Sequence, residues 1–263
     1  MKSIQCVTVV TGLALLLQAG PARAEEALVT DRPDFVESSD VVGRGRLQLE
    51  TSLAGERSTA NGVHVKGLAT PTLLRLGVAE DWELRLETEG WRRETSSGGG
   101  ASEQGFADLA LGAKWHWRDG DAERGLPGLA WLLHVDLASG SAAFRGAGTR
   151  PSLRLSAEWD LPAGYNLGLM PGLYHDHNEA GHGFVGGILA LSLGRQFSAA
   201  LHAFVELAGQ QLAADKNGGQ QISFDTGLSY LLGDSLQIDA AIFCGLNKRT
   251  PQLQWTAGVS KRF

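Results

Sequence analysis

Three histidines gather in one short stretch of the sequence, between Tyr174 and His182. His175, His177 and His182 carry the imidazole groups that bind zinc and related metals. His175 and His177 are two residues apart, which on a strand places both on one face with Asp176 on the other. A zinc site needs three or four converging ligands with partners that orient them, whereas this stretch falls in an expected external loop. The sequence therefore predicts no metal site and leaves the role of this loop open.

Motifs of enzyme chemistry are also missing from the sequence. It contains no Gly-x-Ser-x-Gly elbow, no His-Glu-x-x-His pair and no phosphate-binding glycine loop between a strand and a helix. His134 and His202 could be recruited by an enzyme at the rim of a barrel, but nothing beside either one marks a nucleophile. We predict no enzyme and no cofactor, and keep a rim enzyme acting on lipid or ester substrates as the least favoured alternative.

Ionisable side chains recur at alternate positions of otherwise apolar stretches. Because successive side chains of a strand fall on opposite faces, this pattern separates a charged face from an apolar one. Inside a barrel, such charges pair across the lumen or line a wet channel. For any single residue, pairing that only holds the barrel together is the simpler interpretation. The predicted solute path comprises Glu50, Arg75, Arg85, Glu87, Asp108, Lys114, Arg154, Glu158, Glu206, Asp225 and Asp239, and the other predicted inward residues are Arg46, Glu83, His134 and Asp136.

The elements that position these charges have a period of two from Arg44 onward, and no helical stripe competes with it. Each segment is long enough for a tilted strand to cross a bilayer, about 9 to 11 residues or slightly more, whereas strands of soluble sandwiches are mostly shorter. We predict an all-β fold, a transmembrane up-and-down antiparallel β-barrel of about twelve strands. The predicted segments are 44–57, 63–79, 82–93, 106–118, 128–139, 149–161, 165–176, 184–195, 198–210, 220–232, 235–247 and 251–263.

Connections between these segments alternate in length, as expected for short periplasmic turns and longer external loops. Glu80-Asp81 and Gly233-Asp234 are short, and the Gly/Ser-rich run 94–105 is long. The polar stretch 119–127 is a misfit, because it lies on the side where turns should be tight. With the N-terminus in the periplasm, a set of aromatic residues falls at the periplasmic level, as in the girdles of membrane barrels. This set is Trp82, Trp117, Trp131, Trp159, Tyr165, Tyr230 and Phe263.

The two ends of the chain predict export to the outer membrane. Residues 1–24 have the basic start, apolar stretch and Ala22-Arg23-Ala24 ending of a signal peptide, so cleavage is expected after Ala24. Cleavage would remove Lys2 and Arg23 and leave 21 basic against 29 acidic residues, a net charge of −8, which is a poor match for nucleic acid. Cys244 alone would remain, which excludes an intramolecular disulfide.

The last strand ends on Phe263 behind alternating apolar residues, and resembles the C-terminal signature that the outer-membrane assembly machinery binds. Lys261 departs from that signature, because the position two before the end is usually apolar. The expected partners are therefore outer-membrane lipid, the barrel assembly machinery and a small-molecule solute.

Several motifs in the N-terminal half resemble one known family. They are Thr30-Asp31-Arg32-Pro33-Asp34-Phe35-Val36-Glu37-Ser38, Gly45-Arg46-Leu47-Gln48-Leu49-Glu50, Pro71 to Val78 followed by Trp82 to Leu86, and Asp108-Leu109-Ala110-Leu111-Gly112-Ala113-Lys114. The sequence is similar in these places to the outer-membrane transporters grouped as the MetA-pathway of phenol degradation family. The resemblance implies a passive transporter, and only the family name suggests an aromatic solute.

Residues 25–43 precede the first expected strand and contain the most charged of these motifs. Asp31, Arg32, Asp34 and Glu37 around the rigid Pro33 are unsuited to a lipid-facing strand, so this segment is expected in the periplasm or in the barrel mouth as a plug or gate. A tail bound to lumen charges for stability is an equal alternative. For the whole protein, three functions remain open: a passive channel for small organic solutes, a non-transporting envelope scaffold, and the rim enzyme.

Overall fold

The computed structural model describes residues 27–60, 62–97 and 102–263. The predicted signal peptide and its cleavage site therefore lie outside the described residues. Two short 3₁₀ turns, Pro162–Gly164 and Asp215–Asn217, are the helical elements of the described ranges. In these ranges no helix has the length and apolar character required to cross a membrane.

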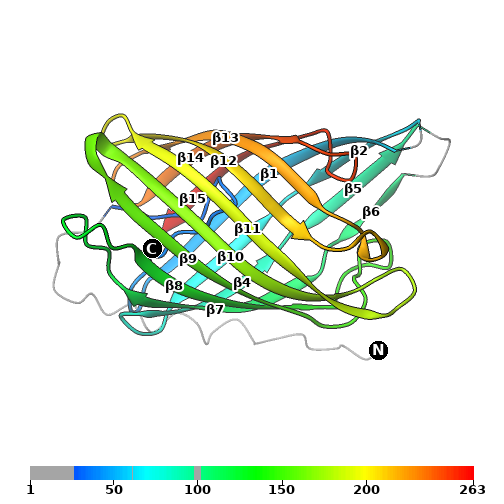
Figure 1. Cartoon of the computed structure of the whole chain (residues 1–263), viewed down its shortest axis with the longest axis horizontal. Helices are drawn as coiled ribbons and strands as arrows, with labels where there is room; N and C mark the ends of the chain where they lie inside the picture. Colours follow the sequence, from blue (N-terminus) through cyan, green and yellow to red (C-terminus); the bar gives the residue numbers. More distant parts are fainter. Residues whose placement is uncertain (1–26, 61, 98–101) are drawn as a thin grey trace, which may run out of the picture.

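The chain forms one antiparallel sheet that closes on itself into a barrel (Figure 1), because the last strand, β15, pairs with β1 from Gln48↔Arg262 to Arg57↔Leu253. The strands are β1 (Leu47–Ala60), β2 (Val63–Ala69), β3 (Thr72–Gly77), β4 (Trp82–Thr88), β5 (Trp91–Ser96), β6 (Glu103–Phe106), β7 (Leu109–Arg118), β8 (Gly128–Leu137), β9 (Arg150–Leu161), β10 (Tyr165–His177), β11 (Gly183–Gln196), β12 (Leu201–Leu212), β13 (Gln221–Leu231), β14 (Leu236–Gly245) and β15 (Leu253–Arg262).

Three of the fifteen strands continue a neighbour rather than add a new wall strand. β1 pairs with β3 along its first half and with β2 along its second half, so β2 and β3 form one course interrupted before Pro71. In the same way β4 continues into β5 after a break at Gly90, and β6 continues into β7 after a break at 107–108. The wall therefore has twelve strands, and the predicted fold class is confirmed. The interruptions are a difference from the unbroken segments expected at 63–79, 82–93 and 106–118.

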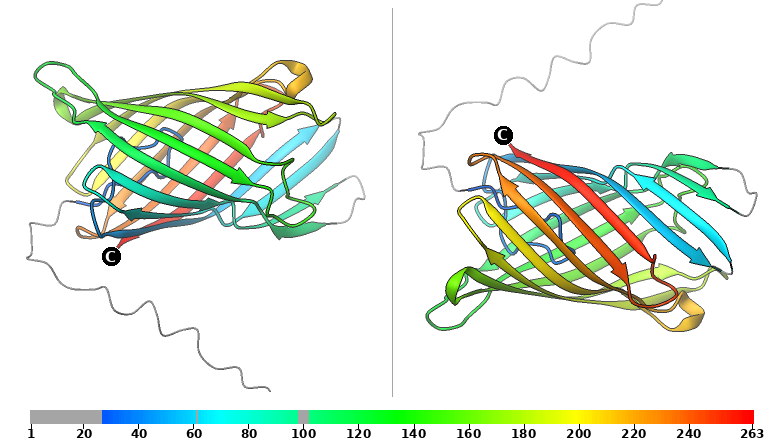
Figure 2. Two further views of the ribbon diagram at one scale, coloured as in Figure 1. Left: turned by 90° about the horizontal axis from the view of Figure 1, so that it is seen from below. Right: turned by 90° about the horizontal axis from the view of Figure 1, so that it is seen from above.

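The two ends of the barrel differ in their connections. The end that carries Phe263 has most of the short turns, and we call it the turn end; the opposite end is the loop end. At the loop end, β5 runs to Ser96 and β6 begins at Glu103, inside the run 94–105 that was expected to be a loop. The polar stretch 119–127 at the turn end forms a small hairpin closed by the pairing of Asp121 with Leu126. Figure 2 shows β2, β5 and β6 at the loop end.

The outer face of the wall is apolar. Leu84, Leu191 and Ile242 are among many large apolar side chains that point outward and are exposed. Trp82, Trp117, Tyr165, Tyr230 and Phe263 are also exposed at the turn end, with Trp82 stacked on Trp115 at 5.7 Å between ring centroids. An apolar band bordered by aromatic residues is the surface that a membrane barrel offers to lipid.

The inner face is polar and surrounds the N-terminal segment. Residues 28–42, which we call the plug, precede β1 and form no strand or helix. They lie within the barrel, toward the turn end (Figure 2, dark blue). The segment expected either in the periplasm or in the barrel mouth therefore folds back into the lumen.

Candidate functional site

Four glutamates of the wall accept hydrogen bonds from the plug backbone. Irregular backbone at membrane depth is tolerated only where protein or water satisfies its polar groups. Glu206 on β12 accepts from the N–H groups of Phe35 and Val36 at 2.9 and 2.8 Å, one to each carboxylate oxygen. The other three acceptances are Glu50 from Asp31 at 3.1 Å, Glu158 from Ser39 at 2.5 Å and Glu83 from Val42 at 3.0 Å. The wall thus supplies the hydrogen bonds that the plug cannot make within itself.

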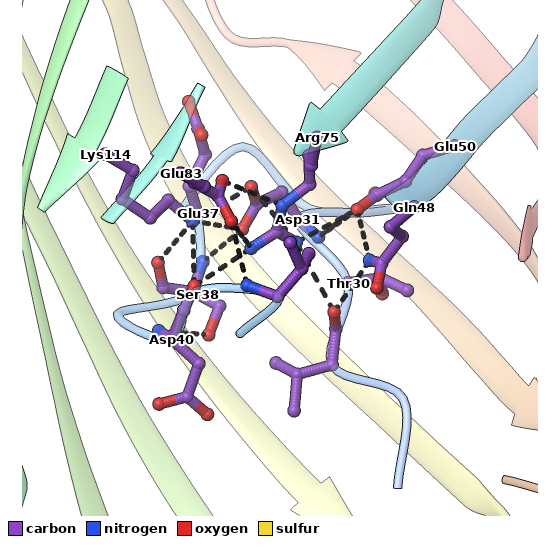
Figure 3. A network of polar contacts seen from close by, with 12 residues as sticks. Thr30, Asp31, Glu37, Ser38, Asp40, Gln48, Glu50, Arg75, Glu83 and Lys114 are labelled. Carbon is purple, nitrogen blue, oxygen red and sulfur yellow. Dashed lines mark hydrogen bonds and ion pairs between the residues drawn. The ribbon is translucent and has the colours of Figure 1, made fainter. Parts of the chain in front are cut away.

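Asp31 is the most heavily bonded side chain of the plug (Figure 3). Its carboxylate accepts from Lys114 Nζ at 2.7 and 2.9 Å and from Arg85 Nη1 at 2.5 Å, and Arg75 Nη1 lies 3.4 Å away. These cations project inward from β7, β4 and β3, which are neighbours in the wall. Buried charges are stable only when they are paired and hydrogen-bonded. The carboxylate of Asp31 is an ion-pair partner of all three cations.

Glu37 is the second plug carboxylate that pairs with cations of the wall. Its two oxygens pair separately with Arg85 Nη2 at 2.5 Å and with Arg154 Nη1 at 2.7 Å. Its backbone carbonyl accepts from the hydroxyl of Ser156, and the guanidinium of Arg154 also lies over the ring of Phe35 at 5.8 Å. Arg85 therefore bridges Asp31 and Glu37 through its two terminal nitrogens.

Two aspartates of the plug have opposite electrostatic environments. Burial alone would raise the pKa of Asp31, but the nearby cations Arg75, Lys114 and Arg85 outweigh it and hold this pKa below the ordinary range. Burial, together with the neighbouring carboxylate of Glu158, raises the pKa of Asp34 to about 7. Asp34 accepts a hydrogen bond from Ser192 at 3.3 Å. One plug aspartate is thus held as an anion, and the pKa of the other lies near neutral pH.

Apolar contacts seat the middle of the plug. Val36 packs in a buried cluster with Met170, Ala190 and Ala208 on β10, β11 and β12. Gly168 on β10 leaves room for Val36, since a Cβ there would lie 2.8 Å from the Val36 Cγ1. Small residues on the inner face therefore make the space that this side chain occupies.

Arg32 anchors the plug to another part of the wall, on β14 and β15. Its guanidinium donates to Asp239 on β14 at 3.1 Å and to Thr256 on β15 at 2.7 Å. The amides of Gln48 and Gln237 bond to plug atoms as well, to the Val29 carbonyl at 2.8 Å and to the Thr30 hydroxyl at 2.9 Å. Contacts around the circumference, rather than at one point, hold the segment.

The plug separates two cavities of the lumen. The larger, of about 930 Å³, is lined by Asp31 to Phe35, by wall residues that include Arg85, and at its loop end by Phe144 and Gly146. The smaller, of about 520 Å³, lies toward the turn end and is lined by Ser38 to Asp40, His116, Glu158 and His202. None of the described residues lines both cavities. Solute-sized space therefore exists on both sides, interrupted by a stretch of chain.

The structure brings most of the predicted path residues onto the plug and places three elsewhere. Asp108 accepts from the backbone of Ser139, Gly140 and Gly146 and from Arg150, so it holds the loop after β8. Glu87 lies 3.6 Å from the Nε2 of His134, and Asp225 bonds to Ser223 beside it on β13. The residues that bond the plug are Glu50, Arg75, Arg85, Lys114, Arg154, Glu158, Glu206 and Asp239.

Several contacts of the plug escaped prediction. Glu83 was placed on the inner face but not among the path residues, although it binds Arg75, Arg85 and the Val42 N–H. Gln48, Ser156, Ser192, Gln237 and Thr256 were not singled out at all. Their only signal was the alternation that puts them on the polar face, since uncharged polar residues are common on any strand.

The histidines have structural neighbours. His175 and His177 belong to the end of β10, not to the external loop expected for the cluster, and their rings meet edge to face at 5.1 Å between centroids. His134 contacts Arg85 at 3.1 Å and His202 contacts Asn166 at 3.1 Å. Neither contact supplies the nucleophile that the rim-enzyme alternative required.

Proteins of known structure share this architecture. No curated protein matches the sequence. An outer-membrane channel from Pseudomonas putida F1 has a similar structure, with a TM-score of 0.67, 13% identity, and coverage of 88% of this chain and 99% of that one. The β domain of the Bordetella autotransporter BrkA has a TM-score of 0.56 and 13% identity, and the match covers 83% of this chain and 100% of that one. The KdgM porin has a TM-score of 0.52 and 12% identity, and the match covers 82% of this chain and 99% of that one.

These likenesses show the fold of outer-membrane barrels. The sequence model of one family matches residues 30–263, which extends the resemblance noted in the N-terminal half over the whole barrel. The chain therefore belongs to the family described as "Putative MetA-pathway of phenol degradation".

Proposed function

We propose that this protein is an outer-membrane channel for the passive passage of small organic solutes, with residues 28–42 as its gate. One observation carries the proposal: the lumen holds two cavities, of about 930 and 520 Å³, and the plug lies between them. Every contact described between plug and wall is non-covalent, so the plug can leave without breaking the barrel. The gate residues are Asp31, Arg32, Asp34 and Glu37.

The lining suggests which solutes to test. Ligand sites of this size, about 300–1,000 Å³, hold drug-sized molecules, and most of the larger cavity is lined by charged and polar groups. The family description directs attention to aromatic compounds. A panel should therefore contain phenol, benzoate, an aliphatic carboxylate and an uncharged sugar.

Permeability of liposomes tests the proposal directly. Proteoliposomes with the full chain are compared with a variant lacking residues 25–43, and each protein is first checked for the heat-dependent migration of a folded barrel. We expect slow passage through the intact protein and faster passage through the deletion variant. If neither folded protein passes any member of the panel, the channel function fails.

A second function, a non-transporting scaffold barrel, is favoured by the number of bonds that hold the plug. If the plug stays docked under all conditions, the barrel is closed by its own side chains. In that case the intact protein passes nothing and only the deletion variant is permeable. Passage through the intact protein would exclude this alternative.

We further propose that the turn end faces the periplasm and that the C-terminal strand is the segment bound by the assembly machinery. The short turns and exposed aromatic residues at that end support this orientation. Protease added to intact cells should then cut loop-end sites, such as the stretch 140–148, and spare the hairpin at 119–127.

A further inference from the structure

We propose that the wall residues Arg75, Arg85, Lys114 and Arg154 form a binding site for carboxylate-bearing solutes, above all dicarboxylates. The plug occupies this site with Asp31 and Glu37 as an intramolecular ligand, and a solute of this class opens the gate by competing for it. The inference rests on the proposed channel and gate, and it names the solute class of that channel. We call these four wall residues the cationic site.

Charge balance within the ion-paired cluster is the first argument. Among the described residues, the wall contributes the four cations of the cationic site and two carboxylates, Glu50 and Glu83. Within these ion pairs, the wall therefore contributes an excess of two positive charges. Asp31 and Glu37 supply two negative charges and complete the neutral cluster. Removal of both would leave an excess of positive charge facing the lumen, and a dianion that enters there is attracted to it.

Geometry is the second argument. The planar fork of a guanidinium matches carboxylates, and the two terminal nitrogens of Arg85 each bind a different plug carboxylate. Arg154 takes the remaining oxygen of Glu37, and Lys114 binds both oxygens of Asp31. The cationic site thus already holds two carboxylate groups close together, which is the arrangement that a small dicarboxylate presents.

Access is the third argument. Arg85, Arg154, Asp31 and Glu37 all line the cavity of about 930 Å³, so a solute there meets the cationic site without passing the plug. The side chain of Arg154 is 19% exposed, the most of the four. An entering carboxylate can therefore pair with Arg154 first and then displace Glu37 from Arg85.

His134 provides an unused donor beside the cationic site. Its Nε2 lies 3.1 Å from the Nε of Arg85, which can only donate, so Nε2 accepts and the proton of the neutral ring lies on Nδ1. That Nδ1 is buried and has no hydrogen-bond partner among the described residues, and the Nε of Arg154 is in the same condition. His134 is 2% exposed and lines the larger cavity. A bound carboxylate would satisfy donors that the plug leaves unpaired.

Competition between plug and solute can be measured by amide hydrogen exchange of the full-length protein in detergent micelles. Glutarate is the probe, glutaramide is its uncharged counterpart, and sodium chloride keeps the ionic strength equal. We expect saturating glutarate to speed exchange of the amides of Phe35, Val36 and Ser39 by about tenfold or more, because their hydrogen bonds to the wall are lost. Unchanged exchange, or an equal effect of glutaramide or salt, would overturn the inference.

Two variants make the test specific to the cationic site. Glu37→Gln removes one competing carboxylate, so calorimetry should show glutarate binding at least about tenfold more tightly than to the parent protein. Arg154→Gln should lose the response to glutarate, whereas Arg249→Gln, in an exposed pair with Asp215 at 3.5 Å, should keep it. If Arg154→Gln does not fold, the Glu37→Gln comparison still decides. Equal or absent binding by folded Glu37→Gln overturns the inference.

Failure of this inference can be told from failure of the channel function. A protein that passes solutes into liposomes but ignores glutarate in exchange and calorimetry is a channel without this site. A protein that binds glutarate and releases its plug, yet passes nothing, has the site but is not a channel.

Discussion

Lys114 on β7 donates to both carboxylate oxygens of Asp31, 83 residues earlier in the chain, at 2.7 and 2.9 Å. The Lys114 side chain is completely buried and Asp31 nearly so. This pair joins the wall to the plug at a point that also involves Arg75 and Arg85. The stability of the gate is therefore set largely by whether Asp31 remains charged and in place.

Asp31→Asn should release the plug while leaving the barrel folded. The change leaves three wall cations with one carboxylate fewer, and removing one member of a buried pair costs about 3–5 kcal/mol. The backbone hydrogen bonds between the wall strands do not depend on Asp31. The variant should therefore still show the heat-dependent gel migration of a folded barrel, and liposome permeability should rise. Asp215→Asn is the control, since its pair with Arg249 is exposed. An Asp31→Asn protein with unchanged permeability would contradict the role of this residue in gating.

Glu206→Gln should weaken the hold on the middle of the plug. The carboxylate accepts one backbone N–H on each oxygen, and an amide offers only one acceptor oxygen. A buried donor without a partner costs about 1–3 kcal/mol, so the Phe35 and Val36 amides should exchange roughly 5- to 150-fold faster. Exchange in the strand ladder of β12 should not change by a similar factor; if it did, the variant would have loosened the barrel itself.

Permeability should increase with pH through the titration of Asp34. Burial and the nearby Glu158 raise its pKa to about 7 from the ordinary 3.8. The docked plug therefore gains stability from the proton on Asp34 at low pH, and loses it as pH rises through 7. We expect faster solute passage at pH 8 than at pH 5, and a flatter profile for Asp34→Asn. A profile unaltered by this substitution would assign the pH dependence to other groups.

Gly168→Ala should displace Val36 from its seat. The added Cβ would lie 2.8 Å from the Val36 Cγ1, and overpacking of this kind costs about 1–3 kcal/mol. Faster exchange at Val36 is expected, and Val36→Ala in the same chain should restore slow exchange by removing the clash. Gly187→Ala is a matched control, because the Cβ added there would lie no closer than 3.6 Å to its neighbours.

Phe263→Ala should reduce assembly without removing barrel closure. The Phe263 N–H donates to the Leu47 carbonyl at 2.8 Å, a bond that alanine keeps, and the residue is 66% exposed. If the assembly machinery recognises the ring, the amount of folded protein in the outer membrane should fall severalfold. Phe197→Ala removes another exposed aromatic residue at the turn end and should have little effect. Equal losses of folded protein in the two variants would show that the effect comes from removing any exposed aromatic residue of the turn end, and not from recognition of Phe263.

Residue alternation predicted the barrel well because it is a local property of each strand. Strands such as β9 and β13 repeat apolar and polar residues with a period of two, and this fixes which side chains face lipid. The breaks before Pro71 and at Gly90 were less visible, because a short interruption changes the pattern too little to separate two strands. The extension of β5 and β6 into a Gly/Ser-rich run was missed since that composition is typical of loops.

The sequence by itself determined the class of fold, the twelve wall strands, and the polar face that carries residues such as Glu206 and Arg85. Only the tertiary structure decided what these residues contact. The plug has no periodicity to reveal its place, and Glu206 lies 170 residues from the Val36 N–H that it binds. An inward carboxylate has the same sequence pattern whether it faces water, a cation across the lumen or a backbone N–H. Its partner is selected when the barrel closes around the N-terminal segment, because buried charges and N–H groups must then be paired.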